Sequence, residues 1–206
     1  MPRRLSLPIL LTALVLLPHC SLPIRGEHSE VDNFQLVGSK SRIWFVGIKN
    51  NAVAVPGVFA ELAGMIDVTG HRGWIEVQIA SLATGDAQRD QTIATHLFGA
   101  KDHPVARFAI KDTSGADALP PPGSSVELDV TGLLTLRGIE TALSVPARLT
   151  RETLERIRVQ TLSPVVLTKE QLQLEKAFQV LQAVCGHKAL SGAVPIQFDL
   201  VFEADH

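Results

Sequence analysis

The sequence predicts a mainly β fold, with short antiparallel strands arranged as a barrel or a sandwich and two helices among them. Three observations lead to this prediction. Apolar and polar residues alternate along much of the chain, as in strands with one buried and one solvated face. Glycine and proline turns separate these runs at short intervals. Only two stretches, 87–98 and 169–185, carry apolar residues at helical spacing.

Residues 1–25 have the layout of an export signal, with a positively charged start followed by an apolar run over 5–17. The run is too short to cross a bilayer as a helix, and Pro18 interrupts it. Cys20 follows as a lipidated cysteine would, although His19 is bulky where a small residue is favoured. We expect an exported protein in the periplasm or outer envelope of a bacterium, attached to a membrane only if Cys20 is lipidated.

A polar linker over 26–33 precedes the strands, and one domain is expected from 34 to 204. The clearest alternation lies at 74–80, 126–138 and 196–202, where aliphatic and aromatic residues share one side and polar residues the other. Weaker alternation predicts further strands at 34–38, 42–49, 52–68, 105–111, 142–150 and 157–167.

The stretch 87–98 has the signals of a helix with defined ends. Asp86 is a favourable N-cap residue, and Gly99 suits the left-handed position after the last turn. The adjacent charges of Arg89 and Asp90 raise the question of a catalytic site. Their place in the first helical turn favours a structural role, in which they tie the preceding loop to the barrel.

The stretch 169–185 predicts a second helix. Thr168 and Gln171 match the spacing of a capping box, and Gly186 is suited to end the helix. The apolar face of this helix comprises Leu174, Ala177, Phe178, Leu181 and Cys185.

Charge and composition argue against several classes of function. A formal net charge of -2 without Lys/Arg blocks speaks against a nucleic-acid surface. The seven histidines do not pair at metal-binding spacings, and the chain has neither a nucleophile elbow nor a phosphate-binding glycine loop. We therefore expect no catalytic residues, no metal and no cofactor. Cys185 and His187 leave one alternative, a haem or redox partner protein, because a C-x-H pair can ligate a metal together with further residues.

The apolar side of the strands leaves two hypotheses about the interior. A barrel of about eight strands is either filled by its own side chains or holds one small apolar ligand. A filled barrel would make the protein a structural or interaction module, and a hollow one would make it a binding protein. Alternation does not distinguish the two.

Three segments, in order, carry a resemblance to the YceI-like family of exported bacterial proteins. SRIWFVGIKNNAVAVPGVFAELAGMIDV (41–68) is similar to the family's opening hairpin. SLATGDAQRD (81–90) and the later HPVARF (103–108) resemble its S-x-x-T-x-(N/D)-x-x-R-D and (Y)P-x-x-F series. VTGLLTLRGIETALSVPARL (130–149) resembles its G-x-L-T-x-x-G-x-T-x-x-x-x-x-V segment. The resemblance extends over 34–203, nearly all of the chain after the signal.

The resemblance implies an elongated antiparallel β-barrel of lipocalin-like shape with about eight strands. It also implies a non-enzymatic role, in which a long apolar lipid of isoprenoid or quinone-like type lies in the lumen. A late R-x-x-F-G-like strand of the family is missing, and the 169–185 helix in its place either closes one end of the barrel or plugs the lumen. Together with the alternation, the resemblance selects as lumen residues Trp44 or Phe45, Phe59, Ile75, Val77, Ile79, Phe108, Leu128, Val130, Leu134, Leu136, Ile196, Phe198, Leu200 and Phe202.

Overall fold

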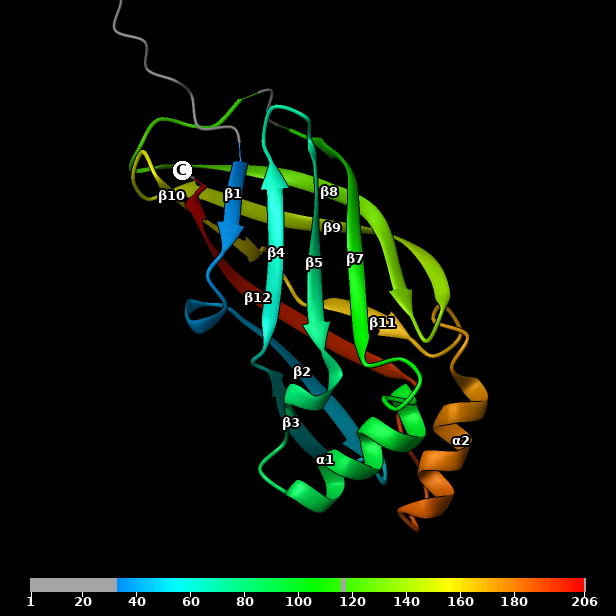
Figure 1. Ribbon diagram of the computed structural model, residues 1–206. Coiled ribbons are helices and arrows are strands. Elements are labelled where there is room, and N and C mark those ends of the chain that lie inside the picture. The colour runs from blue at the N-terminus through cyan, green and yellow to red at the C-terminus, as the bar shows by residue number, and fades with distance from the viewer. Residues whose placement is uncertain (1–32, 116–117, 206) are drawn as a thin grey trace, which may run out of the picture. The chain divides into compact units, whose positions relative to one another are not determined.

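The computed structural model describes residues 33–115 and 118–205, which form a closed antiparallel barrel with two helices at one end (Figure 1). The predicted export signal, Cys20 and residues 26–32 of the predicted linker lie outside the described residues. Along the chain the elements are β1 (Asn33–Leu36), the 3₁₀ turn η1 (Gly38–Lys40), β2 (Arg42–Lys49), β3 (Val53–Phe59), β4 (Leu62–Asp67), β5 (Arg72–Gln78), the 3₁₀ turn η2 (Ile79–Ser81), β6 (Leu82–Ala83), α1 (Ala87–Ile93), the π-helical turn η3 (Ala94–Phe98), β7 (Val105–Ser114), β8 (Ser124–Leu136), β9 (Ile139–Arg151), β10 (Arg156–Thr161), β11 (Val165–Thr168), α2 (Glu175–Val184) and β12 (Ala193–Ala204).

Eight strands form a closed ring in the order β1-β4-β5-β7-β8-β9-β10-β12, and pairing of β12 with β1 completes it. All of these pairings are antiparallel. Closure pairs each ring strand with a neighbour on both sides over part of its length, which reduces the edge available for pairing with other chains. The predicted antiparallel barrel of about eight strands is therefore confirmed.

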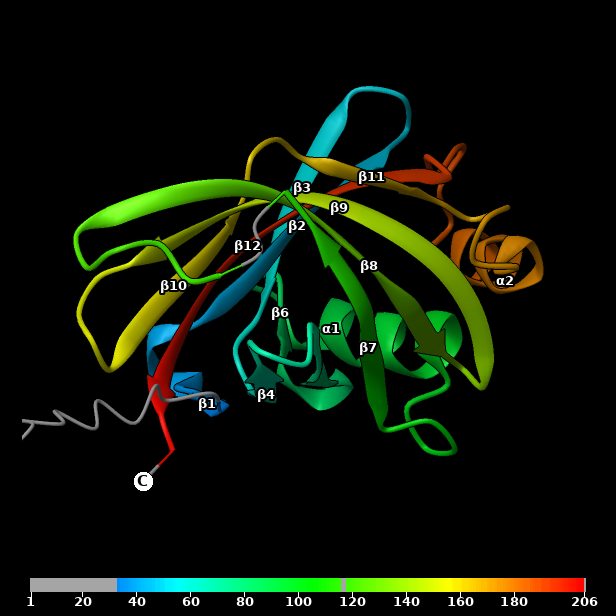
Figure 2. The ribbon, with the colours of Figure 1, turned by 90° about the horizontal axis from the view of Figure 1, so that it is seen from above.

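Several barrel strands are interrupted partway along their length. β1 and β2 both pair with β12, on either side of the η1 turn. In the same way β4 pairs with β1 while β3 pairs with β2, and β11 continues the edge of β12 beyond β10. The strands curve around a common interior (Figure 2).

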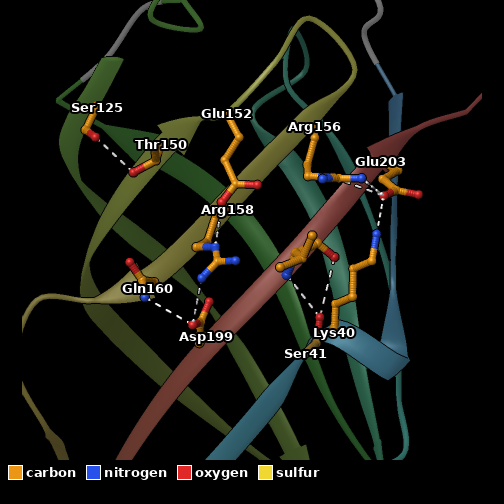
Figure 3. A network of polar contacts seen from close by, with 11 residues as sticks. Lys40, Ser41, Ser125, Thr150, Glu152, Arg156, Arg158, Gln160, Asp199 and Glu203 are labelled. Carbon is orange, nitrogen blue, oxygen red and sulfur yellow. Dashed lines mark hydrogen bonds and ion pairs between the residues drawn. The ribbon is translucent and has the colours of Figure 1, made fainter. Parts of the chain in front are cut away.

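Ser41 holds the first interruption against the opposite strand. Its side chain is fully buried, and its hydroxyl donates a hydrogen bond to the Val37 carbonyl at 2.9 Å. The same oxygen accepts the backbone N–H of Val201 at 3.0 Å (Figure 3). A buried hydroxyl needs such partners, since an unpaired one costs about 1–3 kcal/mol.

The outer face beside this bend is polar, as the alternation predicts. Glu203 on β12 accepts hydrogen bonds from Lys40 at 2.8 Å and from Arg156 at 2.7 Å, and Arg158 contacts Asp199 at 3.3 Å (Figure 3). The nearby Lys40 ammonium, followed by the Arg156 guanidinium, lowers the pKa of the Glu203 carboxyl. All of these side chains reach solvent, so we assign them the small contribution typical of surface ion pairs.

Two clusters of apolar residues hold the barrel together. One gathers side chains around the closure of β1 on its neighbours: Phe34, Leu62, Ile75, Leu149, Ile157, Leu200 and Phe202. The other joins the helices to the barrel through Ile79, Ala94, Ala106, Leu136, Leu174, Ala177 and Phe178. The helices are therefore fixed to the barrel end by burial of their apolar faces.

The predicted helix over 87–98 is confirmed, and the structure divides it into α1 and the π-helical turn η3. Asp86 caps α1 by accepting the backbone N–H of Arg89 at 3.0 Å. The last five residues form the π-helical turn η3, and Gly99 ends it in the left-handed conformation with φ of 60°. The hydrogen bond from the backbone N–H of Arg89 lowers the pKa of the Asp86 carboxyl.

The predicted start of the second helix at 169 is wrong, because α2 begins at Glu175. Thr168 and Gln171 do exchange hydrogen bonds, with distances of 3.0 and 3.2 Å. They close a turn rather than a helix, since Gln173 takes a left-handed φ of 53° that a helix cannot continue through.

Arg89 and Asp90 hold the loop before α1 by contacting one residue, Thr84. The Arg89 guanidinium donates to the Thr84 carbonyl at 2.8 Å and to its hydroxyl at 2.6 Å. Asp90 accepts the backbone N–H of Thr84 at 2.9 Å. The predicted contact of this charged pair with the preceding loop is therefore confirmed.

Replacing Arg89 with alanine should destabilise the protein without changing binding in the interior of the barrel. We expect Arg89→Ala to lower the free energy of unfolding by about 1–3 kcal/mol, because the part-buried Thr84 carbonyl loses its charged donor. Denaturant titration measures this loss, with Gln88→Ala on the exposed side of α1 as the matched control. Binding of the lipid that the family resemblance implies should stay unchanged in the folded variant. Unchanged stability together with lost binding would contradict the structural role.

Candidate functional site

The interior of the barrel is a cavity of about 370 Å³. This volume lies within the range of small-molecule binding sites, about 300–1,000 Å³. Its walls come from the barrel strands and from the helices at one end, and nearly all of its lining side chains are aliphatic or aromatic. The lumen therefore offers a continuous apolar surface to a ligand.

Several inward-facing side chains in the middle of the strands are not fully buried. Phe108, Leu128 and Phe198 point into the barrel and line the cavity, yet each keeps part of its surface accessible. Residues at comparable positions in a filled core would be enclosed on all sides. The barrel is therefore hollow in the part that these residues line, and the hypothesis of a fully packed interior does not fit it.

Glycines opposite aromatic rings help to keep the lumen clear. Gly57 pairs with Phe45 across β2 and β3, and a Cβ atom added at Gly57 would collide with the Phe45 ring. Likewise a Cβ at Gly132 would lie 2.6 Å from Cζ of Phe108. Both rings lie close against the barrel wall, where the missing side chains leave them room.

The structure places the predicted lumen residues around this cavity, with Trp44 as the exception. Trp44 is 44 % exposed and lies on the outer face, so its prediction as a lumen residue is wrong. The physical reason is the two-residue period of a strand, which turns Trp44 outward where its neighbour Phe45 turns inward. The cavity is lined by Phe45, Phe59, Ile75, Val77, Ile79, Phe108, Leu128, Val130, Leu134, Leu136, Ile196, Phe198, Leu200 and Phe202. That any of them contacts a ligand stays a prediction.

The lining also includes residues that the sequence did not single out. Ile43, Ile66 and Ile110 belong to the weaker strands, whose alternation was a sufficient signal to find them. Helical residues also contribute, among them Leu97 from η3 and Phe178 from α2. Since these helical residues border the cavity and leave it open, α2 closes one end of the barrel and does not plug the lumen.

A few polar side chains border the cavity: His71, Arg72, Thr113, Lys169 and Ser191. Nδ1 of His71 lies 2.6 Å from the hydroxyl of Thr113. Nε of Arg72 donates to Asp67 at 3.1 Å. The backbone N–H of Gly70 and then the Arg72 side chain lower the pKa of Asp67. The polar groups are thus confined to a few positions on an apolar wall.

Residues 34–202 match the sequence model of the YceI-like domain. The chain belongs to the YceI-like domain family. The match covers nearly the whole described barrel, from β1 into β12. A comparison with curated proteins returned no match.

Solved structures share the fold of this YceI-like domain. A polyisoprenoid-binding domain from Saccharophagus degradans, implicated in plant cell wall breakdown, superposes with a TM-score of 0.75 at 23% identity, covering 84% of this chain and 98% of its own. BcnA from Burkholderia cenocepacia gives 0.61 at 20% identity, covering 81% and 98%. The Campylobacter jejuni YCEI protein gives 0.59 at 17% identity, covering 77% and 91%. At these identities the likeness establishes the shared fold.

The described part of this YceI-like domain brings no metal ligands together. Within residues 33–115 and 118–205, no three His, Cys, Asp or Glu side chains lie close enough to hold a metal ion. Cys185 is a free cysteine at the end of α2, and neither it nor His187 borders the cavity. The haem or redox alternative therefore gains no support from the geometry of this pair. Of the helices described, none combines the length and hydropathy required for a bilayer crossing.

Proposed function

We propose that this YceI-like protein binds one long-tailed apolar lipid, of isoprenoid or quinone-like type, in the lumen of its barrel and performs no catalysis. The observation that carries the proposal is the open cavity with its nearly unbroken apolar lining. Each CH₂ group of a lipid tail that leaves water for such a surface contributes about 0.8 kcal/mol. A long tail can therefore bind well without a precise polar anchor, and selectivity among tails should be loose.

The comparisons support this choice of ligand class. The Saccharophagus degradans domain that shares the fold is described as polyisoprenoid-binding. The barrel end closed by α1 and α2 supports it too, because a lipid tail needs a lumen shielded from water.

We further propose that the protein acts outside the cytoplasm, in the periplasm or outer envelope. The export signal predicted for residues 1–25 supports this location. A protein that shields an apolar tail from water is also suited to an aqueous compartment between two membranes.

Native mass spectrometry of the protein purified from its host tests both parts of the proposal. We expect one lipid per chain, released on denaturation and identified by lipid extraction, and a chain mass that lacks the export signal. A chain that carries no lipid and takes up neither polyprenyl nor fatty-acyl probes would contradict the binding function. An intact, unmodified N-terminus in the purified protein would contradict export.

A further inference from the structure

The charged side chains that border the lumen are all basic. Among the described residues, the lining includes Arg72, Lys169 and His71, and neither Asp nor Glu. In the whole chain, by contrast, acidic residues outnumber Lys and Arg by 21 to 19. A cavity bordered by one sign of charge favours a ligand group of the opposite sign. The lumen therefore selects against cationic ligands and in favour of an anionic end.

The two strongly basic residues differ in what already neutralises them. The side chain of Arg72 is 73% exposed and bonded to Asp67 at 3.1 Å. The side chain of Lys169 is only 34% exposed, and its Nζ lies 3.8 Å from the nearest carboxylate oxygen in the described structure, that of Glu170. This distance is beyond a hydrogen bond, and Glu170 itself is 62% exposed. Of the two, Lys169 therefore has the longer and weaker ion pair, and its ammonium is the one more easily taken up by a ligand.

The strand β11 explains why Lys169 faces the lumen. Val165 and Leu167 on this strand line the cavity, while Val166 between them is 53% exposed on the outer face. Lys169 follows at the next inward position, just after the strand ends. Its backbone N–H donates to the Gly192 carbonyl at 2.7 Å, which fixes the main chain at this point.

Gly192 also positions the side chain of Lys169. A Cβ atom added at Gly192 would lie 2.6 Å from Cδ of Lys169 and 2.7 Å from its Cε. The alkyl stem therefore crosses directly over Gly192 where Lys169 borders the cavity. The stem adds to the apolar wall while its charged end stays near water.

We propose that Lys169 anchors an anionic head group, so that the lumen ligand is an amphiphile with a long apolar tail and a carboxylate or phosphate end. The inference rests on the proposed function, because the tail must occupy the lumen before its head can reach Lys169. A charge-assisted hydrogen bond from the ammonium to the head group would then set the direction in which the lipid enters.

Matched pairs of acidic and neutral lipids test the anchor. Calorimetric titration of the full chain would compare a fatty acid with the fatty alcohol of equal length, and a prenyl phosphate with its prenol. We expect the anionic member to bind about tenfold more tightly, the size of one hydrogen bond to a charged group. Preference within the first pair alone indicates a carboxylate head, and preference within the second alone a phosphate head.

Two kinds of variant separate the charge from its position. Lys169→Met should abolish the preference and leave the affinity for the neutral lipids unchanged, whereas Lys169→Arg should retain it. Gly192→Ala keeps the charge but displaces the stem, so it should reduce the preference; Gly192 has no positive φ that would strain an alanine. Val166→Ala on the outer face is the control.

The outcomes distinguish this inference from the function on which it rests. Equal binding of anionic and neutral lipids by the unmodified protein, or an undiminished preference in Lys169→Met, would overturn the anchor and leave tail binding in place. If no lipid of either pair binds, the proposed function fails together with the anchor.

Discussion

Leu134→Trp is expected to abolish lipid uptake while the barrel still folds. Leu134 lies on β8, lines the cavity, and keeps part of its surface accessible within the lumen. An indole at this position would occupy the space of several CH₂ groups of a lipid tail. Loss of only two such contacts, at about 0.8 kcal/mol each, already weakens binding more than tenfold.

Its neighbour on the same strand gives the matched control. Leu133 does not border the cavity, and it pairs with two small residues, Ala109 and Ala142. Leu133→Trp makes the same substitution on the outer face and should leave affinity for a fluorescent polyprenyl probe unchanged. Melting curves check that both variants fold. Equal affinity of the two variants would show that the tail does not occupy the lumen beside β8.

Phe202→Ala is expected to cost about 3–5 kcal/mol of stability, the usual range for removing a buried phenylalanine. Phe202 is 1% exposed and packs with Phe34 and Ile157 where the ring closes. Phe198 lies four residues earlier on β12 and also faces inward, but it is only partly buried and lines the hollow part of the barrel.

Phe198→Ala should therefore cost clearly less stability than Phe202→Ala and should instead weaken lipid binding. The reason is that Phe198 already faces open space, so its removal leaves less contact surface unmatched. Urea titration and probe affinity of both variants measure the contrast. If Phe198→Ala is as destabilising as Phe202→Ala and binding is unaffected, the interior behaves as a packed core.

The period-two alternation predicts the strands and most of the side chains that face the interior. Side chains at alternate positions of a strand share a face, which assigns Ile75 and Val77 to the interior. The ambiguity between Trp44 and Phe45 arose because both are aromatic, and only the register of β2 against β3 decides which one turns inward.

The features that sequence could not supply depend on distant parts of the chain. The turn at Thr168 and Gln171 has the hydrogen bonds of a helix start, yet Gln173 breaks the helix there and β11 carries Lys169 to the lumen. The spacing of the capping residues does not reveal such a break. The openness of the lumen is likewise a property of strand tilt and ring closure, which the pattern of apolar residues does not specify.

The position of the lipid tail can be observed most directly by nuclear Overhauser contacts between an unlabelled prenyl chain and labelled methyl groups of the protein. The lumen account predicts contacts from the tail to the methyls of Leu128, Leu134 and Leu200, which line the cavity. It predicts no contacts to Leu133 or Val166 on the outer face. Contacts confined to those outer methyls, with none to the lumen, would contradict it.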